Sequence, residues 1–88
     1  MIEVKQAAAI ASNYMSEVLG ATDLALEEVE CSEDDRFWDI TLSGLVPSAS
    51  RAIASPSLAA FLGHRTYKIF RVDAERGIVK SMKIRNTE

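Results

Sequence analysis

The 88-residue sequence has very few of the residues from which compact metal, nucleophile and disulfide sites are built: one cysteine, one histidine and 7% aromatic residues. A single cysteine, Cys31, cannot form an internal disulfide, which excludes a stapled secreted mini-protein. One cysteine and one histidine also fall short of the usual zinc ligand sets. The sequence lacks a Gly-rich phosphate loop, a nucleophile elbow and a His-Glu-x-x-His motif. We therefore expect no catalysis, no metal and no cofactor.

Long apolar runs are also missing. The longest stretch without a formal charge, residues 52–64, is too short to span a bilayer and contains proline and glycine. The N-terminus has an early acid, Glu3, and lacks the basic segment of a signal peptide. We therefore expect a cytoplasmic protein with no membrane segment. A chain this short rarely holds two cores, so we expect a single domain over residues 1–88.

Charge is divided unevenly along the chain. Residues 1–44 carry ten acidic and two basic side chains, or −8, whereas residues 45–88 carry eight basic and three acidic ones, or +5. The sum of −3 gives no overall attraction to nucleic acid or anionic membranes. If the strands follow one another in chain order, the sheet has a negative edge and a positive edge.

The first half of the chain predicts a helix and a hairpin. Over residues 3–19 apolar residues recur at three- and four-residue steps, and Gly20 follows as a helix-ending residue. Residues 24–31 and 37–43 predict two strands joined by the polar turn 32–36.

In the first of these strands Glu27 falls out of the alternation, which indicates a start near Glu28 or a bulge. We expect Cys31 to be buried on the apolar face and Trp38 to anchor the core. A catalytic dyad of Cys31 with His64 is disfavoured, because a buried thiol is inert.

The second half predicts an insertion and a second hairpin. Residues 45–54 indicate a loop, and Ser55-Pro56 indicates the start of a short helix. Residues 66–73 and 78–85 predict strands on either side of a four-residue turn. The fold class is therefore α+β: an N-terminal helix packed on a four-stranded antiparallel sheet, with a loop/short-helix insertion between strands 2 and 3.

The register of the last hairpin decides which basic residues share a face. A plain four-residue loop sets Lys68 opposite Lys83, whereas a bulge brings Arg71, Lys83 and Arg85 onto one face with Tyr67. Either arrangement could bind single-stranded nucleic acid by phosphate contact and stacking. We favour the alternative that these basic residues lie on an exposed face or edge of the sheet, where neighbouring acidic residues neutralise their charge. Nucleic acid is therefore not the expected partner.

The carboxylate run over residues 27–35 is the densest in the chain. Its oxygens could bind calcium or magnesium. It lacks the alternating acids and central glycine of a calcium loop, so a solvated hairpin tip is favoured.

Residues 67–82 resemble the closing hairpin of PepSY-like domains, with Asp73 and Gly77 at the turn positions. The Ala-rich helix, with Ala7 and Ala11, is similar to the opening helix of that family. Cystatin-like and other small α+β folds share such hairpins. The resemblance implies a non-catalytic module that restrains or modulates a partner, often a peptidase.

We therefore expect an interaction module that binds a protein partner through its sheet or through residues 45–65. The candidate partner-binding residues are Phe61, Leu62, Tyr67, Arg71, Lys83 and Arg85. The alternative is a small-molecule or nucleic-acid binder whose pocket is lined by Tyr67, Trp38 and Arg71. A homodimer is a further option, because small domains gain stability by association.

Overall fold

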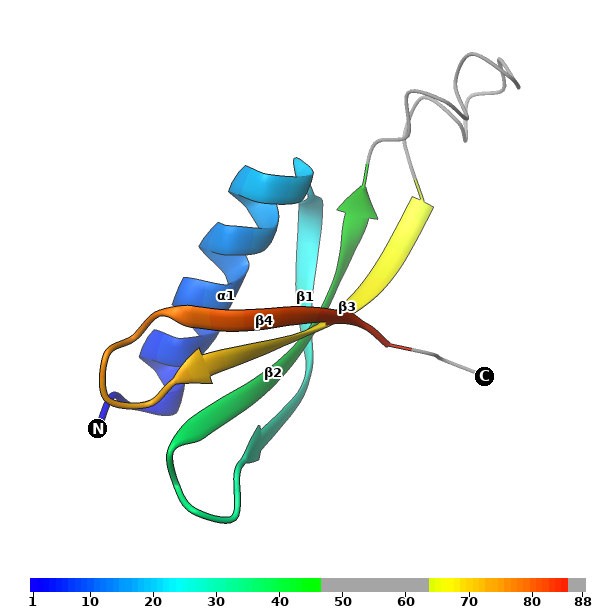
Figure 1. The fold of residues 1–88 in the computed structure, drawn as a ribbon. Helices are drawn as coiled ribbons and strands as arrows, with labels where there is room; N and C mark the ends of the chain where they lie inside the picture. The colour runs from blue at the N-terminus through cyan, green and yellow to red at the C-terminus, as the bar shows by residue number, and fades with distance from the viewer. Residues whose placement is uncertain (47–63, 86–88) are drawn as a thin grey trace, which may run out of the picture.

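The computed structural model describes residues 1–46 and 64–85, in which one helix precedes four strands (Figure 1). The elements are α1 (Val4–Leu19), β1 (Thr22–Cys31), β2 (Phe37–Val46), β3 (His64–Asp73) and β4 (Val79–Ile84). The strands form one antiparallel sheet in chain order, β1-β2-β3-β4, with α1 packed on one side. The predicted α+β architecture is confirmed.

The strands flanking the insertion are longer than predicted. Leu45 and Val46 belong to β2 and pair with Arg65 and His64 of β3, where the sequence indicated a loop. Gly44 and Pro47 are loop signals, so the predicted strand stops at residue 43, whereas β2 continues through the apolar pair Leu45 and Val46. The remainder of the predicted loop and short helix, residues 47–63, lies outside the described residues.

Helix α1 is set by the spacing of its small and apolar residues. Ala7, Ala11 and Met15 are buried at four-residue steps, so one stripe of the helix faces the sheet. The backbone N–H of Glu3 donates to Oε1 of Gln6 (3.2 Å), which caps the start. Gly20 ends the helix with φ 65°, a conformation that glycine adopts without strain.

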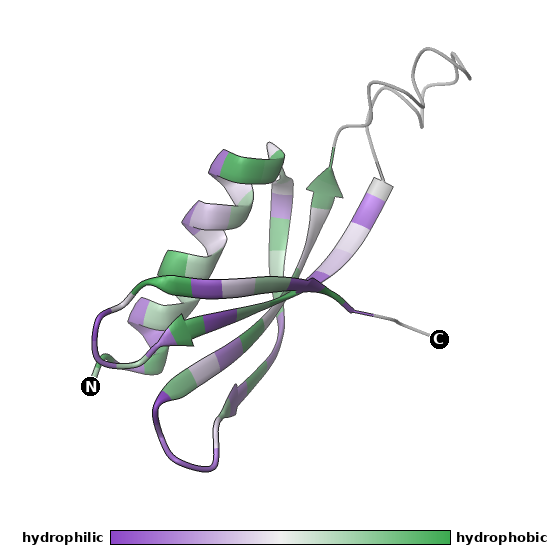
Figure 2. Cartoon of the chain, in the orientation of Figure 1, coloured by the Kyte–Doolittle hydropathy of each residue, from purple (hydrophilic) through white to green (hydrophobic). Residues whose placement is uncertain are grey.

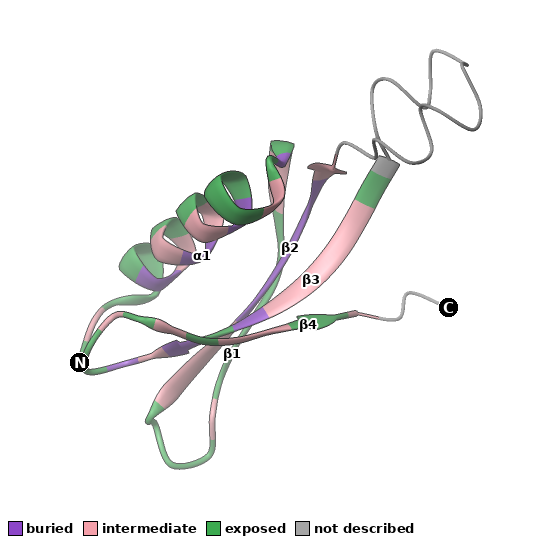
Figure 3. Cartoon of the chain, turned by 45° about the horizontal axis from the view of Figure 1, so that its top comes forward, coloured by how far each residue is buried: buried purple, intermediate pink, exposed green. Residues whose placement is uncertain are grey.

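The core lies between α1 and the two central strands. Four residues from β2 and β3 face the helix and are at most 1% exposed: Ile40, Leu42, Phe70 and Val72. The Tyr14 ring meets Phe70 edge-on, with centroids 5.8 Å apart. In Figure 3 the burial follows this layer, with β1 and β4 exposed over much of their length. Along the strands hydrophobic and hydrophilic residues alternate (Figure 2), as a sheet with two different faces requires.

Gly44 in β2 leaves room for the segment that leads from α1 into β1 to pack closely against it. A Cβ atom on Gly44 would lie 2.5 Å from Cδ2 of Leu24 and 3.3 Å from the carbonyl oxygen of Thr22. No larger residue fits there without a shift of the neighbouring segment.

Register shifts in both edge strands set which of their residues face α1, and the first of them lies between Thr22 and Ala25 of β1. In β1 the register shifts again between Leu26 and Glu28, so Glu27 is the extra residue and the predicted bulge is confirmed. In β4 the register shifts across Lys80, because Arg71 pairs with Ser81 while Val72 pairs with Val79. Simple alternation along residues 78–85 predicts that Val79 shares a face with Ser81; this is wrong, because the shift places Val79 against the core.

The N-terminal residues connect the two hairpins. The backbone N–H of Ile2 donates to the carbonyl of Ala74 (2.6 Å), and its carbonyl accepts from the indole Nε1 of Trp38 (3.1 Å). Trp38 packs against the core as predicted, and it is partly buried. The segment before α1 thus holds β2 and the β3–β4 turn together.

Cys31 is exposed, so its predicted burial is wrong. It lies at the end of the edge strand β1, where Leu26 (53%) and Val29 (37%) on the same side are also exposed. The alternation placed Cys31 on the correct face, but α1 lies mainly over β2 and does not cover that edge.

Candidate functional site

The side of the sheet that faces away from α1 is not covered by any described element; we call it the open face. Cross-strand pairing arranges its centre in two rows. One row is Glu30, Asp39, Arg71 and Ser81, and the other is Glu28, Thr41, Ile69 and Lys83. Residues from all four strands therefore meet on this face.

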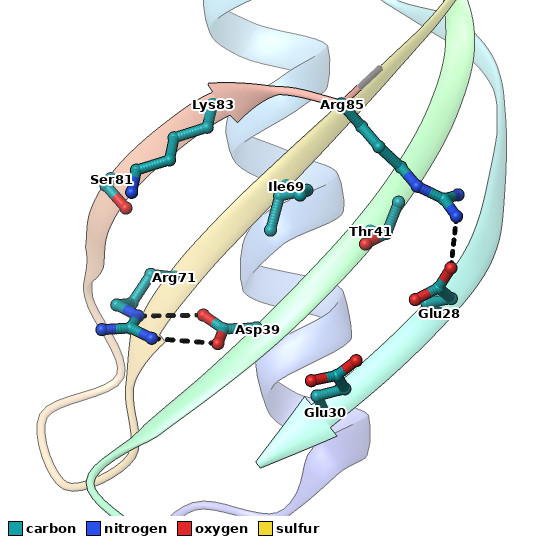
Figure 4. A pocket seen from close by; sticks show the side chains of 9 residues that line it. All are labelled: Glu28, Glu30, Asp39, Thr41, Ile69, Arg71, Ser81, Lys83 and Arg85. Carbon is teal, nitrogen blue, oxygen red and sulfur yellow. Dashed lines mark hydrogen bonds and ion pairs between the residues drawn. The ribbon is translucent and has the colours of Figure 1, made fainter. Parts of the chain in front are cut away.

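The open face is hollowed by a pocket of about 280 Å³ (Figure 4). Thr41 and Ile69 lie at its centre, and charged side chains surround them. Its acidic members come from β1 and β2, and its basic members come from β3, β4 and the residue after β4: Glu28, Glu30, Asp39, Arg71, Lys83 and Arg85. The predicted division of charge between the two hairpins thus appears on one concave surface.

Arg71 is fixed at one end of the pocket. Its Nε and Nη2 donate to Oδ1 and Oδ2 of Asp39 (2.9 and 3.1 Å), a bidentate geometry. These bonds and the charge of Asp39 raise the pKa of the Arg71 guanidinium. The guanidinium also lies 4.9 Å from the ring centroid of Phe37. Arg71 is thus held flat against the sheet.

Arg85 pairs with Glu28 across the full width of the sheet. In a flat sheet the two edge strands would lie about 14 Å apart, at roughly 4.8 Å per strand. The ion pair therefore bridges this width over the open face through two long side chains. Arg85 is positioned by its backbone N–H, which donates to the carbonyl of Tyr67 (3.1 Å).

Beyond the pocket, a fully buried hydroxyl is satisfied by two charged groups. Ser43 Oγ donates to Glu27 Oε2 (2.8 Å) and accepts from Nη1 of Arg65 (2.7 Å). Arg65 also pairs with Asp23 through Nη2 (2.5 Å). The bulged β1 is therefore tied to β3 over the top of β2.

Glu30 and Lys83 have no ion-pair partner among the described residues. The other four charged side chains of the pocket neutralise one another. With three acids and three bases, the face attracts neither polyanions nor polycations as a whole. The acidic side chains therefore offset the positive charge of the basic ones, as the sequence predicts.

Four of the six predicted partner-binding residues share the open face: Tyr67, Arg71, Lys83 and Arg85. This is the bulged register, and the alternative that set Lys68 opposite Lys83 is wrong because Lys68 pairs with Ile84. The other two, Phe61 and Leu62, lie outside the described residues.

The predicted pocket of Tyr67, Trp38 and Arg71 does not form. Trp38 pairs with Val72 on the helix side, whereas Arg71 pairs with Asp39 on the open side. Glu28 and Asp39 are not among the predicted site residues. Their alternation with apolar neighbours could have placed them on this face, but their ion-pair partners depend on a register that the sequence left open.

The two residues of the disfavoured dyad lie at opposite ends of β2. Cys31 pairs with Trp38 and His64 pairs with Val46, a separation along the strand of roughly 25 Å. Desolvation and nearby acids, chiefly Asp35, raise the pKa of the Cys31 thiol. The thiol is therefore less nucleophilic at neutral pH than an ordinary cysteine.

The acidic hairpin tip is organised by its own hydrogen bonds. Asp34 Oδ1 accepts from Ser32 Oγ (2.7 Å) and from the backbone N–H of Arg36 (3.2 Å), which lowers the pKa of Asp34. Within residues 1–46 and 64–85, no group of three or more acidic, cysteine or histidine side chains is arranged to hold a metal ion.

Comparison with known proteins gives no relative: no family model, no curated protein and no solved structure matches the chain. In the described part of the chain, no helix is long and apolar enough to cross a membrane.

Proposed function

We propose that the chain is a non-catalytic interaction module that binds a protein partner on its open face. The observation that carries this proposal is the concave, uncovered surface on which the half-buried Ile69 lies between two ion pairs. The Arg71–Asp39 and Arg85–Glu28 pairs are held by the sheet, so they present charges in fixed positions at little entropic cost.

The chemistry of the face suggests what it binds. Lys83 and Glu30 offer one positive and one negative group beside the apolar side chain of Ile69. A complementary segment would carry an acidic and a basic side chain on either side of a small apolar residue. A polar protein loop has that composition, whereas single-stranded nucleic acid would meet three carboxylates.

We further propose that the chain modulates its partner, as PepSY-like domains do. A helix followed by four antiparallel strands agrees with that resemblance. The turn at Asp73 and Gly77 supports it too: Asp73 Oδ1 accepts from the backbone N–H groups of Glu75 and Arg76 (2.8 and 2.9 Å), and Gly77 has φ 66°. A small-molecule site is less favoured, because the pocket is at the small end of the usual range and its charges are mostly paired.

Affinity capture with matched variants tests this proposal. The full chain is immobilised as wild type, as Ile69→Ser and as Val18→Ser, and the proteins retained from a lysate of the source cell are quantified. Val18 is an exposed apolar residue on α1, so it controls for the loss of an apolar side chain away from the site.

We expect at least one protein to be retained by the wild type and by Val18→Ser and to fall about tenfold with Ile69→Ser, as for a central interface residue. Circular dichroism of the three proteins checks that they are equally folded. Identical protein sets on all three columns would contradict the proposal.

A further inference from the structure

The outer edges of β1 and β4 are not paired with any described element. Unpaired edges expose backbone N–H and C=O groups and invite the addition of another strand. The regular part of β1 beyond its bulge is Glu28–Cys31, and the regular part of β4 beyond its bulge is Ser81–Ile84. Both segments are regularly paired on their inner side, so their outer side can pair with a further strand.

We propose that a second copy of this chain extends the sheet, with its β1 added to β4 in an antiparallel, head-to-tail contact. A copy in the same orientation meets this requirement, because β1 and β4 run in opposite directions in the four-stranded antiparallel order. All helices then lie on one side of the extended sheet.

One register satisfies both faces at once. It sets Val29 opposite Ile84 on the helix side, and both are exposed apolar residues (37% and 79%). On the open side it sets Glu30 opposite Lys83, the two pocket charges that have no ion-pair partner within residues 1–46 and 64–85. Directly opposed apolar pairs and opposite charges both stabilise strand pairing.

The neighbouring positions are compatible with this register. Cys31 falls beside Met82, which is partly buried on the helix side. Glu28 falls beside Arg85, and since these two already pair within one copy, this contact exchanges an ion pair and does not add one.

Charge selects the head-to-tail contact over the symmetric ones. Joining two β1 edges would place Glu28 and Glu30 of one copy near the same acids of the other. Joining two β4 edges would bring Lys83 and Arg85 near their own counterparts. Like charges across strands are destabilising, so the acidic edge of one copy fits the basic edge of the next.

Sedimentation velocity of the purified full chain over a range of concentrations tests the contact. The mass of the wild type should rise with concentration, and added salt should reduce the association. Glu30→Lys or Lys83→Glu alone should weaken the association about tenfold, because each sets like charges opposite one another. Lys5→Glu, an equal charge change on α1, should have little effect.

The decisive sample is an equimolar mixture of the Glu30→Lys and Lys83→Glu chains. Each interface between two unlike chains again joins opposite charges, so association in the mixture should return toward the wild-type level. A wild type that stays monomeric, or a mixture that associates no better than its components, would overturn the proposal. Because only this chain is present, the result is independent of any partner bound at the open face.

A disulfide trap reads the register directly. In a Cys31→Ser background, chains with Val29→Cys and chains with Ile84→Cys are mixed and oxidised. We expect a linked heterodimer, and much less of it when Lys83→Cys replaces Ile84→Cys, since Lys83 points to the other face. Equal yields from the two mixtures would contradict the proposed register.

Discussion

On the helix side of β3, Phe70 and Val72 are fully buried, whereas on the open side of the same strand Ile69 and Arg71 remain in contact with solvent. The first pair is stabilised by removal of apolar surface from water, which is worth roughly 25 cal/mol per Å². On the open side Arg71 is held by its ion pair with Asp39, and an exposed ion pair is worth about 0–1 kcal/mol. We therefore expect the helix side of this strand to contribute most of its stability, and we propose the open side for recognition.

The largest difference in the free energy of unfolding is expected between substitutions of adjacent residues on the two faces. Phe70→Ala should lower the free energy of unfolding by about 3–5 kcal/mol, because it opens a cavity against Tyr14. Ile69→Ala, one residue away and half-buried, should cost about 1 kcal/mol. Urea unfolding followed by circular dichroism measures both. Similar losses would contradict the division of roles between the faces.

A close approach on the helix side gives the next effect. Gly44→Ala should lower the free energy of unfolding by about 1–3 kcal/mol, because its Cβ would meet Leu24 and the Thr22 carbonyl. The Gly44→Ala/Leu24→Ala double variant should lose less than the sum of the two single changes. Additive losses in urea titrations would mean that the contact with Leu24 is not the cause.

The turn between β3 and β4 should make a pH-dependent contribution to the free energy of unfolding. Hydrogen bonds from the backbone N–H groups of Arg76 and Glu75 lower the pKa of Asp73 from its usual 3.8. A carboxylate with a lowered folded pKa stabilises the fold above its unfolded pKa, and this stability is lost as the pH falls through the folded pKa.

Asp73→Asn should therefore be less stable than the wild type at pH 7, and the gap should close as the pH falls below about 4. Asp34→Asn, at the other turn, gives an independent comparison, because hydrogen bonds also lower the pKa of Asp34. Urea midpoints at pH 7, 4 and 2.5 measure the gap. A gap that stays constant over this range would contradict the assignment.

The smallest effect is expected on the open face. A double-mutant cycle of Asp39→Ala and Arg71→Ala should give a coupling of about 0.2–1 kcal/mol, since the Arg71 side chain is 44% exposed. The coupling should shrink at high salt. A salt-independent coupling well above this range would show that the open face also holds the fold together.

The parts of the fold set by local patterns could be predicted from the sequence. The four-residue spacing of Ala7, Ala11 and Met15, together with Gly20, identified α1 to within one residue. The alternation in β2 identified Trp38, Ile40 and Leu42 as helix-facing. These signals depend on neighbours in the chain and need no knowledge of the tertiary structure.

Features that depend on long-range pairing were only partly predictable. The bulge at Lys80 moved Val79 into the core, and no local residue signals that shift. The exposure of Cys31 depends on which strands α1 covers, and the sequence does not specify this. The pairs of Arg71 with Asp39 and of Arg85 with Glu28 join residues on different strands, so they could be identified only once the register was known.

The bond from Trp38 to the Ile2 carbonyl also gives the chain a built-in optical reporter. Trp38 is the only tryptophan, and its indole donates to a residue that precedes α1. Its emission should therefore respond when the first residues detach from the sheet, even where the sheet itself stays intact. A red shift without loss of far-UV ellipticity would mark that local opening, and global melting would change both signals together.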